Sequence, residues 1–226
     1  MVDGVGTLQT STLAEQAYRS LRDRIVRGDL PAGQRLMPEE LGQALSISPT
    51  PVKEALLMLE RDGLIESSAR RGASVRRFTS RDIGDLYDAR LMIEQRAISV
   101  GHAAGRLDAA TLTRLSGIVA LHAERSTRRS ASDLRQALHH DHDLHSVIAG
   151  LAGNPLLADW HQRLLRQTQL LRAYSLRAYD AGRLARAARD HAAILLAMRD
   201  GDPAAANLAL ETHLANSLAS VLAGHS

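Results

Sequence analysis

Apolar residues recur every four positions near the start of the chain, at Leu13, Ala17, Leu21 and Ile25. This spacing is typical of one buried face of an α-helix, and Gly28 follows it as a stop. The preceding residues 1–10 show no such period and predict a loose tail. The first regular element is therefore expected to be a helix that Gly28 ends.

Two further helices are predicted between Pro38 and Gly63, with a short turn between them. Ile47 in this turn should point inward, Ser48 suits the N-cap of the later helix, and Pro49 suits its first position. The buried positions of the earlier helix are expected at Leu41, Ala44 and Leu45. Those of the later helix are expected at Val52, Ala55, Leu56 and Leu59.

Strands at residues 64–66 and 73–75, joined through Gly72, complete this segment. Helix, turn, helix and hairpin in this order predict a winged helix–turn–helix domain over residues 11–78. The second helix of such a motif is usually presented to the DNA major groove. The free N–H groups at its start suit a phosphate, and Thr50 and Lys53 project where they could reach base edges or the DNA backbone.

The rest of the chain has a helical pattern with short breaks at glycine and proline. Six helices are predicted, over residues 81–104, 108–128, 131–150, 155–178, 180–200 and 203–223. Short connections between helices favour an antiparallel bundle of six to seven helices over residues 79–226. The fold class predicted for the whole chain is therefore mainly α.

The composition of the 226 residues agrees with this fold, because 45% are hydrophobic and only 3% are aromatic. The absence of cysteine excludes disulfides and thiolate metal sites. The sequence has no run of about 18 apolar residues and no secretory signal. We therefore expect a cytoplasmic protein without a membrane partner.

The net charge of +3 does not by itself indicate a nucleic-acid partner. Basic residues are instead clustered on the predicted wing, at Arg70, Arg71, Arg76 and Arg77. Such a run is either a solvated surface or a set of phosphate contacts, and its place on a wing favours the contacts. The candidate DNA-binding residues are Arg35, Ser48, Thr50, Lys53, Arg70 and Arg71.

Histidine placement suggests metal chemistry in the helical segment. Asp141 and His145 lie four positions apart on one helix face, and His191 and His213 fall on two later helices. Three imidazoles and one carboxylate suit zinc, nickel or manganese. On spacing alone the signal is weak, because the chain has ten histidines and such a pair arises easily by chance.

Residues 13–77 resemble the DNA-binding domain of the GntR family of bacterial transcription regulators. The matching segments are Tyr18–Leu36, Thr50–Leu56 and Leu59–Ile65. The resemblance implies operator binding as a homodimer. At Glu39, Pro49 and Lys53 the chain departs from the arginines that usually contact the operator, so we expect a weaker or non-standard operator.

Residues 81–220 resemble the helical effector domain of the FadR-type branch of this family, which is called the FCD domain. The matching segments are Leu86–Glu94, Asp141–His145, Ala152–Leu156, His191–Asp202 and His213–Leu214. The resemblance implies a metal site and leaves His140 and His142 at the surface. Its implied ligands are Asp141, His145, His191 and His213. For a site with these donors we expect zinc before nickel or manganese.

Open positions on such an ion would suit a small carboxylate effector. Arg90 is a candidate counter-charge for this effector, although an i,i+4 pair with Glu94 explains Arg90 equally well. Arg172 is a second candidate effector-binding residue, for which an exposed or core-edge role is the alternative.

The sequence therefore predicts a transcription regulator, not an enzyme, whose operator binding responds to a small carboxylate bound near a divalent metal. A metal sensor and a purely structural metal are alternatives. A metal-dependent enzyme is a third alternative, but the chain has no HExxH motif and Glu94 is the one candidate base beside the metal.

Overall fold

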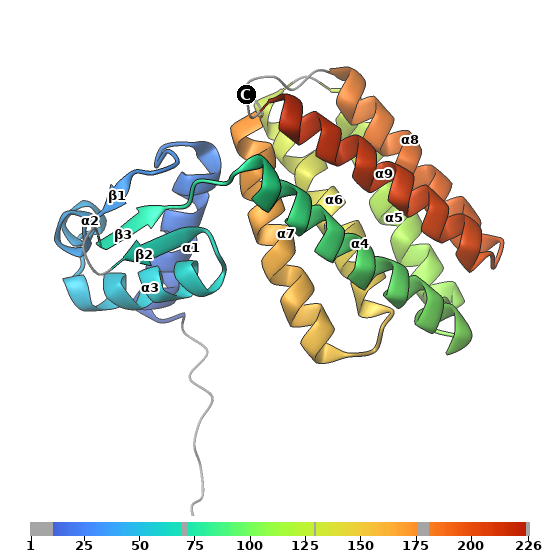
Figure 1. Ribbon diagram of the computed structural model, residues 1–226, viewed down its shortest axis with the longest axis horizontal. Helices are drawn as coiled ribbons and strands as arrows, with labels where there is room; N and C mark the ends of the chain where they lie inside the picture. The colour runs from blue at the N-terminus through green and yellow to red at the C-terminus, as the bar shows by residue number, and fades with distance from the viewer. Residues whose placement is uncertain (1–10, 69–71, 129, 176–180, 225–226) are drawn as a thin grey trace, which may run out of the picture. The chain divides into compact units, whose positions relative to one another are not determined.

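The structure, a computed structural model, describes residues 11–68, 72–128, 130–175 and 181–224. The chain divides into two compact units, with the boundary between Arg77 and Phe78. Three helices and a small sheet make up the first unit, and the described residues of the second unit form helices (Figure 1). The predicted fold class, a winged helix–turn–helix followed by a helical bundle, is confirmed. The tail predicted for residues 1–10 lies outside the described residues.

Helix α1, Leu13–Arg27, begins with a capping box formed by Thr12 and Glu15, and it ends at Gly28. The buried face consists of Ala14, Ala17, Leu21 and Ile25. The predicted burial of Leu13 is wrong, because its side chain is exposed. Each four-residue step turns a helix about 40° beyond a full turn, and three such steps carry Leu13 out of the stripe that ends at Ile25.

Helices α2, Pro38–Leu45, and α3, Pro49–Arg61, form the helix–turn–helix. The face predicted for α3 is buried as expected, at Val52, Ala55, Leu56 and Leu59. In α2 the buried residues are Leu41 and Gly42, whereas Ala44 is exposed and Leu45 is half-buried. A Cβ atom on Gly42 would lie 2.9 Å from the backbone oxygen of Ile47, so the turn folds back onto this glycine, and Ile47 itself is half-buried.

The three strands of the first unit form an antiparallel sheet in the order β1–β3–β2. Strands β2 and β3 are the predicted wing strands, and the register of β3 pairs Val75 with Ile65 and Ala73 with Leu36. Strand β1 was not predicted, because two residues are too few to show a period. The bounds are Arg35–Leu36 for β1, Ile65–Ser68 for β2 and Gly72–Val75 for β3.

The second unit contains six helices in the residues described. They are α4 (Ser80–Ala103), α5 (Ala109–Ser126), α6 (Ala131–Gly150), α7 (Pro155–Ser175), α8 (Ala181–Arg199) and α9 (Pro203–Ala223). A helix was predicted in each of these segments, and Thr79 caps α4 through a capping box with Asp82.

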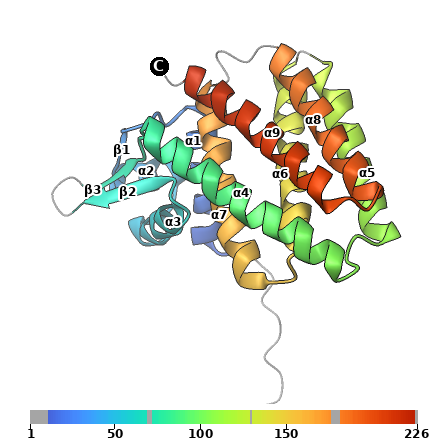
Figure 2. The same ribbon diagram turned by 45° about the vertical axis from the view of Figure 1, so that its right-hand side comes forward.

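The helices of the bundle pack in pairs. Helix α8 lies along α9 and α5 along α6, while α4 contacts α9, α6 and α7 (Figures 1 and 2). The interior faces of α6, α8 and α9 bring polar side chains from distant parts of the sequence together. None of the described helices combines the length and apolar content that crossing a bilayer requires.

Candidate metal centre and nucleic-acid interface

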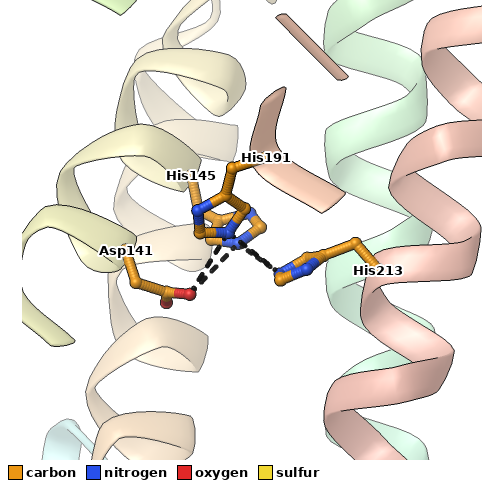
Figure 3. Close-up of side chains that lie close together, drawn as sticks. All are labelled: Asp141, His145, His191 and His213. Atoms are coloured by element: carbon orange, nitrogen blue, oxygen red, sulfur yellow. Dashed lines mark hydrogen bonds and ion pairs between the residues drawn. The ribbon is translucent and has the colours of Figure 1, made fainter. Parts of the chain in front are cut away.

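Four polar side chains from three helices point toward one another inside the bundle (Figure 3). They are Asp141 and His145 on α6, His191 on α8 and His213 on α9. One ligand atom from each lies within 4.8 Å of the others, and no residue of the four is more than 5% exposed. Burial of a carboxylate among imidazoles is costly unless these groups bind a cation or pair with one another.

The Nε2 atoms of the three imidazoles face a common point. The Nε2 atom of His213 lies 3.2 Å from that of His145 and 3.2 Å from that of His191. Asp141 Oδ1 lies 3.4 Å from His191 Nε2 and 3.9 Å from His145 Nε2. Four ligands bound tetrahedrally at 2.0–2.1 Å would lie about 3.3 Å apart, so the spacing suits an ion of the size of zinc.

Glu94 of α4 holds His145 in the orientation that ligation needs. Its Oε2 atom lies 2.6 Å from His145 Nδ1, and its Oε1 atom lies 2.8 Å from Nε2 of His161 on α7. Burial alone would raise the pKa of Glu94, but His145 and Arg90 hold it well below its ordinary value. An ionised Glu94 accepts the Nδ1–H proton of His145 and leaves the Nε2 lone pair for a metal.

Asp141 is held in a similar way from the opposite side. The Arg172 guanidinium donates to Asp141 Oδ2 and also to Ser217 Oγ, the latter at 2.8 Å. Burial would raise the pKa of Asp141, but Arg172 and the hydrogen bond from His191 hold it well below its ordinary value. The carboxylate is thus ionised, with Oδ1 directed toward the histidines.

The three histidines of the cluster are neutral at pH 7. Burial lowers the pKa of His145, His191 and His213 to about 4 in each case. His213 Nδ1 also lies 3.5 Å from Asp190 Oδ2, a carboxylate that accepts a hydrogen bond from Asn216. Neutral imidazoles are the form that binds metal, so the cluster is ready for an ion without first losing protons.

A pocket opens beside the cluster, between α5, α6, α7, α8 and α9. Asp141 and His213 line it, together with Arg172. Its cavity volume is about 40 Å³. An ion held by the four residues would therefore lie beside this cavity, because two of its ligands also line it.

In the first unit, α3 presents its first turn at the surface. Ser48 occupies the predicted N-cap position with extended backbone, although its side chain makes no capping hydrogen bond. Ser48, Thr50 and Lys53 are exposed, as is Arg35 on β1. Their contact with DNA stays a prediction, and the predicted contacts Arg70 and Arg71 lie outside the described residues.

Comparison with known proteins identifies both units. Residues 13–75 match the family described as bacterial regulatory proteins, gntR family, and residues 85–216, more than half of the chain, match the FCD domain. The chain belongs to the GntR family. This confirms the resemblance found in the sequence, and the FCD domain agrees with the FadR-type branch.

The GntR-family relatives include proteins that match most of the chain and proteins that match only part of it. The HTH-type transcriptional repressor NanR of Klebsiella aerogenes is 27% identical over 224 residues, which cover 92% of this chain and 84% of that protein. The uncharacterised HTH-type transcriptional regulator YdhC of Bacillus subtilis is 32% identical over 85 residues, 38% of each chain. With YdhC and some other relatives, the match thus spans little more than a third of their own length.

Two solved structures share the fold. A structural-genomics crystal structure of a GntR regulator from Rhodococcus sp. RHA1 has a TM-score of 0.76 at 26% identity, and the match covers 94% of this chain and 99% of that one. Escherichia coli McbR/YncC also has a TM-score of 0.76, with 96% and 100% coverage, and its 19% identity supports the fold alone. The relatives are named as transcription regulators, in agreement with the prediction of a regulator instead of an enzyme.

The candidate effector residues have different surroundings in this GntR-family bundle. Arg90 is fully buried and donates from Nε to Glu94 Oε1 at 3.1 Å, which is the intrahelical pair weighed as its alternative role. Arg90 does not line the pocket beside the cluster, whereas Arg172 does. Of the histidines expected at the surface, His140 and His142 are both half-buried and outside the cluster.

Sequence reasoning missed the residues that surround the four candidate ligands. Glu94 was considered only as a base or as a partner of Arg90, and His161 and Asp190 were not considered. His122 of α5 was also missed, and its ring centroid lies 4.6 Å from that of His191. Glu94 is 51 positions from His145 and 67 from His161, so no local spacing could reveal these contacts.

Proposed function

We propose that this protein is a transcription regulator that binds operator DNA as a homodimer in the cytoplasm. A small carboxylate bound beside a divalent metal in the FCD domain controls that binding. The observation that carries the proposal is the convergence of Asp141 and three histidines beside a pocket, in a chain whose other unit is a winged helix–turn–helix.

The DNA-binding half of the proposal rests on α3. Pro49 and Pro51 have no N–H group, so the N–H groups that suit a phosphate at the start of α3 are those of Ser48 and Thr50. The side chains of Thr50 and Lys53 are exposed near this end of the helix. In a homodimer, two such helices would read half-sites one helical turn apart. Glu39 and Pro49 make this surface less cationic than one with arginines there, and Lys53 lacks the two-pronged guanidinium of arginine. These differences support an operator that differs from the usual family sequence.

The metal-binding half rests on the donor set. Asp141 Oδ1 and the Nε2 atoms of His145, His191 and His213 would hold the ion, while Glu94 and Arg172 keep two of these ligands oriented. Nitrogen and carboxylate ligands suit zinc, and nickel or manganese would also be accepted. A bound ion supplies a Lewis-acidic centre to which the oxygen atoms of a carboxylate can bind.

The effector would act by binding one arrangement of the dimer more tightly than another. A ligand shifts such an equilibrium only by the difference between its affinities for the two arrangements. Arg172 is placed to sense the ligand, because it lines the pocket and also holds Asp141. We infer that Arg172, in place of Arg90, is the effector-binding arginine of the two named from the sequence.

A metal sensor is the second candidate function. One carboxylate and three imidazoles fill all four positions of a tetrahedral zinc ion, which leaves no position for an effector unless the ion accepts a fifth ligand. In that case the metal itself would be the signal, and the pocket would hold only water.

One experiment separates these two functions. Operator sequences are first selected from a random duplex pool with purified full-length protein. The dissociation constant for the selected DNA is then measured by fluorescence anisotropy with chelated protein, metal-loaded protein and metal-loaded protein with a panel of small acids. A change that needs both metal and acid supports the proposed function, and a change with metal alone supports the sensor. If neither addition changes the dissociation constant, both functions are wrong.

A further inference from the structure

The pocket beside the metal cluster carries more positive than negative charge. Its lining includes Arg172, Arg183 and Arg186, against the two carboxylates of Asp141 and Asp190. A divalent ion at the cluster would make five positive charges against two negative ones. A ligand with one negative charge would leave most of this excess in place, whereas two or three negative charges would nearly balance it.

Arg183 and Arg186 account for the imbalance. They lie three positions apart on α8, so both side chains project from neighbouring turns of the same face. Neither forms an ion pair with a carboxylate among the described residues, whereas Arg172 is paired with Asp141. Arg183 is half-buried and Arg186 is exposed, whereas the four residues of the cluster are buried, so the pocket lining extends from the buried cluster to solvent-accessible arginines.

His122 provides an independent indication that the pocket takes a polar ligand. It is only 2% exposed and lines the pocket, and its Nδ1 atom forms no hydrogen bond with any described residue. A buried polar atom without a partner is unfavourable unless a ligand or a water molecule forms a hydrogen bond with it. His122 therefore offers a buried hydrogen-bonding group in the pocket lining, beside His191 of the cluster.

We propose that the pocket selects a small acid with at least two anionic groups. One group binds at the metal and His122, and the other lies against Arg183 and Arg186. This inference rests on the proposed function, because it specifies the effector of the same site. It narrows the effector class from any small carboxylate to dicarboxylates, tricarboxylates and phosphorylated acids.

The test compares short acids that carry one, two or three carboxylates. Binding of butyrate, succinate and tricarballylate to zinc-loaded full-length protein is measured by isothermal titration calorimetry at constant ionic strength, with thermal shift as a second readout. The same titrations use the double variant Arg183→Gln/Arg186→Gln. The matched control is Arg189→Gln, which removes an exposed arginine of α8 that does not line the pocket.

We expect succinate or tricarballylate to bind at least about tenfold more tightly than butyrate, a ratio that corresponds to one well-placed charged contact. The double variant should reduce this ratio to less than about threefold with its zinc content unchanged, and Arg189→Gln should preserve it. Equal binding of all three acids, or an unchanged ratio in the double variant, would overturn the inference and leave the proposed function standing. If no acid binds, both the inference and the proposed effector control are wrong.

Discussion

The two units of this GntR-family protein place their candidate functional side chains in opposite environments. In the first unit, Ser48, Thr50 and Lys53 lie exposed on the first turn of α3. In the second unit, the four candidate metal ligands are almost fully buried and are held by further charged residues. A substitution in the first unit should therefore change binding with little effect on folding, whereas one in the second should change both.

Two ion pairs on helix α4 show the same contrast between exposed and buried side chains within one helix. Arg81 and Asp85 are highly exposed, and Arg90 and Glu94 are fully buried, although both pairs have i,i+4 spacing. An exposed pair contributes about 0–1 kcal/mol to stability, while removal of one partner from a buried pair costs about 3–5 kcal/mol. Burial, more than spacing, decides how much each pair matters.

The largest expected effect is the loss of metal from a ligand variant. His213→Gln removes one of the three Nε2 atoms, and we expect bound zinc to fall from about one ion per chain to nearly none after dialysis. The measurement is elemental analysis of purified protein. His139→Gln, an exposed position on α6, is the control and should keep its zinc. Full zinc content in His213→Gln would show that the cluster is not the metal site.

Substitution of the residue that orients His145 should have the next largest effect. Glu94→Gln keeps the size of the side chain but leaves the Arg90 charge unpaired, and it weakens the contact to His145. We expect zinc affinity to fall by about 10–100-fold and unfolding free energy to fall by about 3 kcal/mol. Competition with a chelating dye and urea unfolding measure these two quantities.

The exposed pair on the same helix provides the control for Glu94. Asp85→Asn removes the same charge from α4 at the surface, so zinc affinity should not change and unfolding free energy should fall by less than about 1 kcal/mol. Similar losses in both variants would contradict the distinction between buried and exposed pairs that the structure makes.

Acid should destabilise the metal-free protein through the buried histidines. The folded-state pKa of His145, His191 and His213 is about 4, below the ordinary value of 6.5. Between these values the unfolded chain binds protons that the folded chain excludes, so stability falls as the pH is lowered. We expect a loss of about 1 kcal/mol for each histidine between pH 7 and pH 5.5.

Calorimetric unfolding of chelated protein at these two pH values checks this expectation. About 1 kcal/mol corresponds to about 2–4 °C in melting temperature for a chain of this size. His213→Gln should show a smaller fall with pH than the wild type, and His139→Gln should show the same fall. A melting temperature that does not change between pH 7 and pH 5.5 would mean that these rings are not buried in the neutral form.

The order and type of the helices could be predicted from the sequence because each depends on a local apolar period. The face of α3 at Val52 and Leu59 is such a case, since a thirteen-residue helix shows its stripe within one window. Leu13 was predicted to be buried but is exposed, because an apolar stripe with four-residue spacing drifts around the helix. Strand β1 was not predicted, because two residues are too few to show a period.

Only part of the candidate metal site could be predicted from local sequence spacing. Asp141 and His145 share a helix face and could be paired by spacing, but His191 and His213 join them through the packing of α8 and α9. Their selection came from family resemblance. Arg90 shows that spacing predicts a partner but not its burial. The i,i+4 spacing gave Glu94 as the partner, but only the fold shows that this pair is buried.

The smallest expected effect concerns the exposed face of α3. Lys53→Ala removes a cation without disturbing the buried side of the helix, so the melting temperature should stay within about 1 °C and operator affinity should fall by about tenfold or less.

The role of Lys53 decides how this loss depends on sequence and salt. If Lys53 contacts a phosphate, the loss of affinity is equal for all operator sequences, and the slope of log affinity against log salt concentration becomes smaller by about one. If it contacts a base, discrimination falls at one position instead. Anisotropy titrations over a range of salt with single-base operator variants distinguish the two, and Arg27→Ala on α1 controls for the loss of one positive charge. An unchanged affinity in Lys53→Ala would remove α3 from the DNA interface and, with it, the contrast between an exposed reading surface and a buried metal cluster.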